Sequence, residues 1–259
     1  MGRLVDYYSI DVVILVEASC EPSEILKVLN YRRESKYMIA PTLAKGFQIY
    51  VNFPPEFIGA IAESDRYTIR ALKLPITLEY LLVGTHMPSK LYRDPAEQTF
   101  FASSLSAEIR GIERDRGHNR TILVGDFNMN PFEEGMIQAN AFNAVSSYAV
   151  AKKSKGSRGY YGESYAFFYN PMWNFLGDRT LFKPGTYYYD SGALSNYYWN
   201  MFDQVLIRPS IAGSFSYNKL KIIEFDGGQK LTTASGKPDA SISDHLPVAF
   251  EVKLEIVGK

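Results

Sequence analysis

Seven polar side chains in this sequence stand at the ends of apolar stretches and carry oxygen or imidazole groups. Four of them follow an apolar stretch and three precede one; they are Glu17, His86, Asp126 and Asn128, then Asp203, Asp244 and His245. If the second set of strands runs antiparallel to the first, all seven side chains meet at one rim of a sheet. The sequence therefore predicts one pocket assembled from distant segments.

The acids of this set suit a hard cation. Glu17, Asp126 and Asp244 offer carboxylate oxygens, which Mg²⁺ or Mn²⁺ prefers, and these ions keep open positions for water and phosphate oxygens. The three histidines and one cysteine are scattered without the spacing of a zinc site. A cation, an amide and an imidazole can together activate a water, stabilise a charged phosphoryl group and help the leaving oxygen.

Three motifs in order resemble a known family. Gly125-Asp126-Phe127-Asn128 follows the apolar run 121–124, Ser243-Asp244-His245 precedes the alternating run 248–252, and Glu17 ends the apolar run 11–16. Together they resemble the endonuclease/exonuclease/phosphatase superfamily, which are metal-dependent phosphoesterases that include deoxyribonuclease I, apurinic endonucleases, sphingomyelinases and inositol-phosphate phosphatases. The resemblance covers about residues 11–252.

The resemblance implies a role for each matching residue. Glu17 and Asp244 match metal-binding acids, and Asp126 matches the aspartate that handles the nucleophilic water or a metal. Asn128 matches the asparagine that holds the phosphate. His245 matches the histidine that contacts the phosphate or acts in acid/base chemistry.

Two further residues extend this catalytic set. Asp203 resembles the aspartate that orients His245 and favours its charged ring. His86 resembles the second active-site histidine of the deoxyribonuclease I branch, where it would contact substrate, although a structural histidine is the alternative. No acid on a neighbouring strand is an evident partner for His86, so Glu63 or Asp65 would have to reach it.

The aromatic and basic segments allow two interpretations each. Asn170 and Trp173, with the tyrosines that gather between Tyr160 and Tyr198, either form a substrate-binding wall or pack in an aromatic layer. The loop 151–162, with three lysines and one arginine, is either solvated or contacts a phosphate backbone at the rim of the cleft.

Apolar and β-branched runs predict the strands that must position these groups. The expected strands are 11–16, 47–51, 68–74, 78–83, 122–124, 205–207, 220–224 and 248–252. One helix should follow Glu21-Pro22, and a longer one should begin at Asp94-Pro95 and end before Gly117.

Length, charge and cysteine content restrict the class of protein. The 259 residues suit a single domain over 1–259, and the formal charge of +0 provides no overall basic field for nucleic acid. The sole cysteine, Cys20, excludes an internal disulfide and is expected to be structural. With no leader or membrane-spanning run, we expect a cytoplasmic protein.

The family fold implied is an α/β protein, a four-layered α/β sandwich with two packed, mainly antiparallel sheets. Family members usually begin with a strand that carries a metal- or water-binding asparagine, and only ten residues precede Asp11. We therefore expect this strand to be missing, which exposes a sheet edge.

These observations lead to a hypothesis and its rivals. We expect a hydrolase that uses Mg²⁺ or Mn²⁺ to cleave phosphodiesters, most plausibly a nuclease-like enzyme with nucleic acid among its candidate substrates. A phosphomonoesterase or phospholipid/inositol-phosphate hydrolase is one rival, and a non-catalytic binding module on the same fold is the other. The sequence leaves the oligomeric state open.

Overall fold

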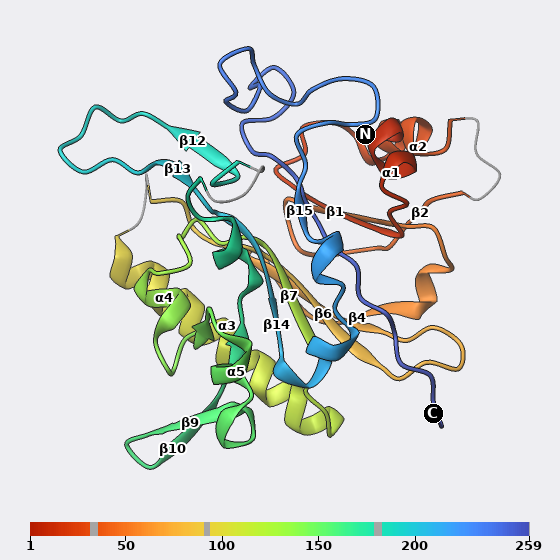
Figure 1. Ribbon diagram of the computed structural model, residues 1–259. Helices are drawn as coiled ribbons and strands as arrows, with labels where there is room; N and C mark the ends of the chain where they lie inside the picture. The colour runs from red at the N-terminus through yellow and green to blue at the C-terminus, as the bar shows by residue number, and fades with distance from the viewer. Residues whose placement is uncertain (32–35, 91–93, 179–182, 259) are drawn as a thin grey trace.

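The computed structural model describes residues 1–31, 36–90, 94–178 and 183–258. Helices lie on the two outer sides, with sheets between them (Figure 1). The described helices are α1 (Gly2–Tyr7), α2 (Pro22–Leu29), α3 (Pro95–Arg116), α4 (Glu134–Ile137) and α5 (Tyr148–Ala151).

A large mixed sheet forms the centre of the molecule. Within the described residues it has seven strands in the order β4-β5-β6-β7-β14-β11-β8, parallel at β6–β7 and β11–β8 and antiparallel elsewhere. The strands are β4 (Ile58–Ser64), β5 (Tyr67–Leu72), β6 (Tyr80–His86), β7 (Thr121–Asp126), β14 (Asp203–Ile207), β11 (Phe168–Tyr169) and β8 (Ala144–Val145).

The expected second sheet appears in two pieces in the described part of the chain. One has the order β1-β3-β2, and the other pairs β15 with β16. Their bounds are β1 (Val12–Val16), β2 (Met38–Ile39), β3 (Phe47–Val51), β15 (Lys221–Ile222) and β16 (Val248–Ala249). The predicted strands 220–224 and 248–252 are therefore shorter than expected.

Two hairpins project from this body. They pair β9 (Ser157–Tyr160) with β10 (Glu163–Ala166), and β12 (Tyr187–Tyr189) with β13 (Tyr198–Asn200). In Figure 1 they lie at opposite ends of the left side of the molecule. Neither hairpin is predictable from the sequence, since tyrosine-rich stretches of this length fit strand and loop alike.

Apolar side chains join the layers. The main core cluster contains residues of both kinds of sheet, such as Ile49 of β3 and Val205 of β14. A second cluster packs α3 through Leu105 and Ile109 against the other face of the large sheet. A third packs α1 and α2 against β1 and β3. The order is therefore helices, small sheets, large sheet and helices, which agrees with a mixed α/β sandwich.

The long helix α3 begins and ends as its sequence predicts. The Asp94 side chain accepts a hydrogen bond from the Glu97 N–H at 2.8 Å, and the Glu97 carboxylate accepts one from the Asp94 N–H in return. Gly117 ends the helix with φ of +66°, in the left-handed region that glycine tolerates. The helix covers the face of the large sheet to which Leu123 and Leu206 point.

A buried ion pair connects α3 to β14. The Arg208 Nε lies 2.8 Å from Glu113 Oε1, and Thr121 Oγ1 donates to the same carboxylate at 2.6 Å. Breaking a buried pair of this kind typically costs about 3–5 kcal/mol, because one charge is left without a partner. Arg208 directly follows β14, so the strand that begins at Asp203 is held at its other end.

Candidate active site

Three polar side chains lie in one row across the large sheet. The parallel pairing of β6 with β7 places His86 opposite Asp126, and the antiparallel pairing of β7 with β14 places Asp203 opposite Asp126. Two of these strands end at this edge of the sheet and one begins there. The strand directions predicted from the sequence are confirmed for these three residues.

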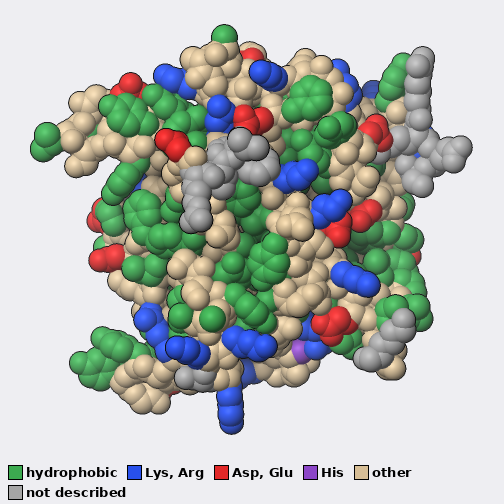
Figure 2. Space-filling view, viewed as in Figure 1, with side chains coloured by type: hydrophobic (Ala, Val, Ile, Leu, Met, Phe, Trp, Pro, Cys, Tyr) green, Lys and Arg blue, Asp and Glu red, His purple; other side chains and the backbone are tan. Residues whose placement is uncertain are grey.

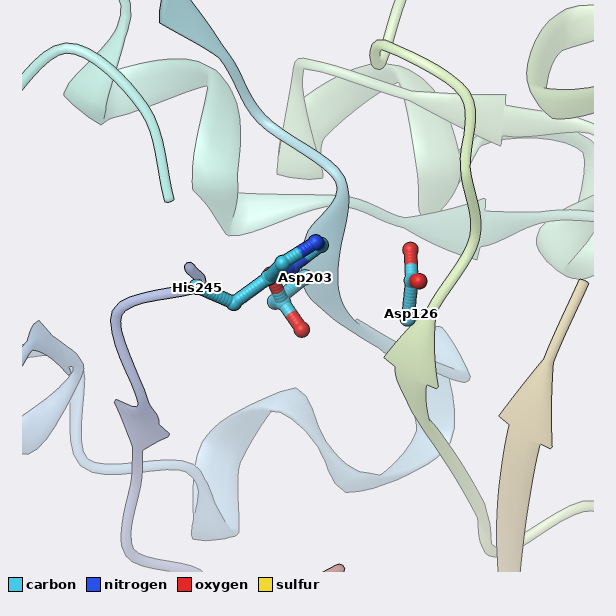
Figure 3. Close-up of side chains that lie close together, drawn as sticks. All are labelled: Asp126, Asp203 and His245. Atoms are coloured by element: carbon cyan, nitrogen blue, oxygen red, sulfur yellow. The ribbon is translucent and has the colours of Figure 1, made fainter. Parts of the chain in front are cut away.

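His245 reaches the same edge from a separate segment. Its Nδ1 lies 2.7 Å from Asp203 Oδ2, and its ring centroid lies 4.7 Å from that of Tyr187. The Leu246 N–H donates to the Thr186 carbonyl at 2.8 Å, which fixes the chain on β12. Ligand atoms of Asp126, Asp203 and His245 all lie within 4.8 Å of one another, with Asp126 at the tip of β7 facing the other two (Figure 3).

The environment changes the proton affinity of this group. Burial lowers the pKa of His245, but the charge of Asp203 and its hydrogen bond outweigh burial and raise the pKa to about 9. Burial, then the nearby charge of Asp203, raises the pKa of Asp126 to about 7. The site therefore holds a protonated imidazole beside a carboxyl group whose ionised form is disfavoured by burial.

Asn128 holds Asp126 in place. Its backbone N–H donates to Asp126 Oδ1 at 2.8 Å, and its Nδ2 donates to Asp126 Oδ2 at 2.8 Å and to the Met87 carbonyl at 2.9 Å. Both amide protons are therefore in use, and the remaining Oδ1 cannot donate to a phosphate. In this structure Asn128 positions Asp126, whereas the family resemblance implied direct contact with the phosphate.

His86 has a different acidic partner from the expected ones. Its Nε2 lies 3.3 Å from Glu17 Oε1 and 3.8 Å from Asp126 Oδ2. Glu63 is instead paired with Arg70 at 2.7 Å. Burial lowers the pKa of His86, and the charge of Glu17 only partly opposes this.

Glu17 belongs to the site but stands at its open side. It directly follows β1, its φ is +55°, and its side chain is 76% exposed. The loop that follows contains Cys20, which is exposed rather than structural, and whose carbonyl accepts a hydrogen bond from Gln48 at 3.0 Å. Glu17 can therefore turn toward a ligand without breaking a buried contact.

Asp244 and Asn170 lie outside the group of Asp126, Asp203 and His245. The Asp244 side chain is exposed and forms no hydrogen bond or ion pair with the described residues. Asn170 is fully buried: its Nδ2 donates to Gln204 Oε1 at 2.7 Å and its Oδ1 accepts from the Met172 N–H at 3.0 Å. Asn170 therefore packs below the site and supports Gln204, so the predicted substrate contact is replaced by a positioning role.

The donor set fits Mg²⁺ or Mn²⁺. Asp126 is a buried carboxylate whose pKa is raised by burial and then by the charge of Asp203, and Glu17 has an exposed carboxylate that also contacts His86. Both supply oxygen, the ligand that these ions prefer. His245 uses its Nδ1 to contact Asp203, so it fits the role of a hydrogen-bond donor better than that of a metal ligand.

Three supporting residues have no motif that identifies them in the sequence: Thr186, Gln204 and Arg66. Thr186 Oγ1 accepts from the Asp203 N–H at 3.0 Å, and Gln204 Nε2 donates to the Met129 carbonyl at 2.7 Å. Arg66 lies in the turn between β4 and β5, where its carbonyl accepts the His86 N–H at 2.9 Å. The Arg66 side chain forms no ion pair with the described residues. Because Arg66 lies in a turn, no sequence motif distinguishes it from other arginines.

The basic loop 151–162 lies at the wrong end of the sheet for a rim contact. A Cβ on Gly156 would lie 3.9 Å from Pro209, and Pro209 comes after the carboxyl end of β14, whereas Asp203 begins that strand. Figure 2 shows Lys and Arg along the lower edge of the molecule, below the β12–β13 hairpin. The solvated interpretation of this loop is the one that its position supports.

The comparisons with known proteins concern the fold. No family model and no curated protein matches the sequence. Solved structures match over nearly the whole chain. An endonuclease/exonuclease/phosphatase family protein from Bacteroides thetaiotaomicron is 15% identical with a TM-score of 0.54, over 97% of this chain and 86% of that one.

Two further structures have the same fold. The catalytic domain of human Nocturnin, with bound sulfate, is 12% identical with a TM-score of 0.53, over 96% of this chain and 83% of that one. TDP2 from D. rerio, complexed with a single-strand DNA product, is 16% identical with a TM-score of 0.50, over 96% and 90%.

These likenesses define the class of fold. The chain is an α/β protein whose structural neighbours are members of the endonuclease/exonuclease/phosphatase superfamily, with the deoxyribonuclease I-like arrangement. At 12–16% identity the comparisons show the fold, while the side chains at the sheet edge carry the argument for activity. No helix among the described residues is long and apolar enough to cross a membrane.

Proposed function

We propose that this protein is a divalent-cation-dependent phosphodiesterase of the nuclease-like type. The observation that carries the proposal is the meeting of Asp126, Asp203 and His245 within 4.8 Å, from two strands and a C-terminal segment. Such a group is what hydrolysis of a phosphoester requires: a carboxylate that acts as a base toward the attacking water and a positive donor for the phosphoryl oxygens.

His245 supplies the positive donor in this scheme. Asp203 holds the Nδ1 proton at 2.7 Å, so the Nε2–H of the imidazolium is the group left to face a substrate. There it donates a hydrogen bond to a phosphoryl oxygen, whose negative charge increases as the water attacks. It can then release this proton toward the leaving oxygen.

Asp126 orients the attacking water and accepts the proton that the water loses as it attacks, while His245 gives its own proton to the leaving oxygen. Both oxygens of Asp126 are fixed by Asn128, so the direction of the remaining lone pairs is set before substrate binds. Glu17 and Asp126 would hold Mg²⁺ or Mn²⁺, which supplies charge neutralisation of the phosphate when bound. Arg66, with no acidic partner among the described residues, is suited to contact a second phosphate oxygen.

The preference for a phosphodiester in nucleic acid has a separate basis. TDP2 from D. rerio, which has the same fold, was solved with a single-strand DNA product. The rival substrates, phosphomonoesters and lipid or inositol phosphates, differ in how their binding depends on salt. Neutralising several nucleic-acid phosphates gives a steep fall in affinity with salt concentration, whereas a single phosphate gives a shallow one.

Hydrolysis of bis-p-nitrophenyl phosphate tests the proposal. We expect turnover with Mg²⁺ or Mn²⁺, loss of turnover with a chelator, and loss in Asp126→Ala and His245→Ala. A matched control is Asp239→Ala, because the Asp239 side chain is only partly buried and, among the described residues, hydrogen bonds to Ser241 alone. Equal rates in the wild type and in both site variants would leave a non-catalytic binding module as the remaining interpretation.

A further inference from the structure

Three aromatic side chains form a partly exposed group beside the site: Phe132, Trp173 and Tyr197. The ring centroid of Phe132 lies 6.3 Å from Trp173 and 5.4 Å from Tyr197, at interplanar angles of 64° and 60°. Phe132 is 37% exposed and Tyr197 is 66% exposed. None of the three belongs to a hydrophobic core cluster of the described residues. We call this group the aromatic platform.

The aromatic platform is built on the same segments as the site. Phe132 comes four residues after Asn128, so the two Cα atoms are at most about 14 Å apart. The buried Asn130 ties these segments together: its Nδ2 donates to Asn200 Oδ1 and its Oδ1 accepts from the Met201 N–H, both at 2.9 Å. These contacts hold the segment that leads to Phe132 against the end of β13, shortly before Asp203 in the chain.

A continuous series of contacts joins the platform to His245. The His245 ring contacts Tyr187, which stacks on Phe202 at 5.4 Å and 19°. The Lys90 ammonium lies 5.2 Å from the Phe202 centroid and forms an ion pair with Glu133, the residue next to the platform in the chain. A ligand that spans this surface meets an imidazole, a cation and then ring faces.

The β12–β13 hairpin is held to the body by contacts that do not involve the exposed rings of Phe132 and Tyr197. On the β12–β13 hairpin, Tyr188 contacts Trp199 at 5.4 Å, and the Lys237 ammonium lies 4.1 Å from the Tyr188 ring centroid. Trp199 packs against the main core. These contacts already hold the hairpin to the body, whereas Tyr197 and Phe132 keep ring area open to solvent. Figure 2 shows hydrophobic side chains along this projecting arm.

We propose that the aromatic platform is a binding subsite for a base of single-stranded nucleic acid, next to the phosphate held at His245. The inference rests on the proposed phosphodiesterase function and names its substrate class. Bases stack on aromatic side chains whatever their sequence, and this attraction needs no net positive charge. The formal charge of +0 is therefore compatible with a nucleic-acid substrate. Lipid and inositol phosphates have no aromatic ring to stack.

Tryptophan fluorescence tests the subsite directly. The chain has two tryptophans, so Trp199→Phe leaves Trp173 as the sole reporter. Titration with single-stranded oligothymidylate should quench Trp173, and a chain of abasic residues of equal length should not. In parallel, anisotropy of a labelled oligothymidylate measures binding to the protein without the Trp199 change, so the result does not depend on folding of that variant.

Variants of the aromatic platform measure how much the Phe132 ring contributes to the affinity for oligothymidylate. Phe132→Ala and Phe132→Leu should each weaken oligothymidylate binding roughly tenfold to one-hundredfold, since both remove the ring. Tyr161→Ala is the matched control, because Tyr161 is 91% exposed on the β9–β10 hairpin away from the site and should leave binding unchanged. Circular dichroism checks that each variant is folded. Equal affinities for wild type and both Phe132 variants, or equal binding of the abasic chain, would overturn the subsite.

The failure of this inference is distinguishable from the failure of the proposed function. Normal hydrolysis of bis-p-nitrophenyl phosphate with no effect of Phe132 on oligothymidylate binding defeats the platform alone. Binding that depends on Phe132 without any hydrolysis supports the platform and defeats the phosphodiesterase proposal.

Discussion

His245 and His86 lie on opposite sides of Asp126, and their surroundings differ. His245 contacts Asp203 at 2.7 Å, and the Asp203 side chain is 20% exposed. His86 contacts Glu17 at 3.3 Å, and the Glu17 side chain is 76% exposed. The pKa of His245 is raised to about 9, whereas the pKa of His86 is lowered by burial.

The difference shows that an acidic partner raises the pKa of a histidine more when its carboxylate is held in place beside the ring. Asp203 begins a strand and its N–H is held by Thr186, so its carboxylate stays beside the ring. Glu17 follows a strand end and is surrounded by water, which screens its charge. One side of Asp126 therefore presents an imidazolium and the other a neutral imidazole.

The largest expected effect is on the His245 side. His245→Gln should lower kcat for bis-p-nitrophenyl phosphate by roughly 10²- to 10⁴-fold, because the variant loses both the charge and the transferable proton. The measurement is steady-state kinetics at saturating Mg²⁺. Retention of more than a tenth of the activity would mean that His245 is not the positive donor.

Gly125→Ala should disrupt the spacing between His86 and Asp126. Gly125 has φ of +148°, and a Cβ there would lie 1.9 Å from the Thr85 carbonyl oxygen. We expect the free energy of unfolding to fall by about 3 kcal/mol or more, since backbone must move and β6 and β7 separate. Gly159→Ala is the control, because its Cβ meets only the Glu163 carbonyl at 3.9 Å. Urea denaturation of both variants measures the free energy of unfolding, and an equal loss in Gly125→Ala and Gly159→Ala would contradict the prediction.

The pH dependence of stability should follow His245. Its folded pKa of about 9 lies above the ordinary 6.5, so the contribution of the imidazolium is fully present below pH 6.5 and is lost as pH rises through 9. In cation-free buffer the wild type should lose at most about 3 kcal/mol over this window, and His245→Gln should lose less. If the free energy of unfolding falls equally with pH in both proteins, Asp203 does not stabilise the protonated form of His245.

The smallest expected effect is on the His86 side. His86→Gln keeps a hydrogen-bonding group in place of a neutral imidazole, so kcat should fall only roughly three- to tenfold. A loss as large as that of His245→Gln would remove the asymmetry between the two sides. NMR titration of the histidines provides the control, because His86 should lose its proton at a lower pH than His245.

Much of this edge of the sheet was predictable from the sequence because strand ends carry the polar residues. The apolar runs that end at His86 and Asp126 and the one that begins after Asp203 gave the strand directions, and hence one shared rim. Likewise, Asp94 and Gly117 defined α3, because capping is a local property of the chain.

Other features depend on contacts between distant segments. Nothing local distinguishes a buried Asn170 from an exposed one, and its placement depends on Gln204, 34 residues away. The partner of His86 was missed because Glu17 comes from a different sheet. Strand β4 was missed because its alternation is interrupted by a bulge between Ala60 and Ala62.

The exposed Cys20, three residues after Glu17, makes the site accessible to magnetic resonance. Since the sequence has no other thiol, a nitroxide label attaches at one position without mutagenesis. Mn²⁺ is paramagnetic, so its coupling to that label would report where the cation sits while the protein remains in solution.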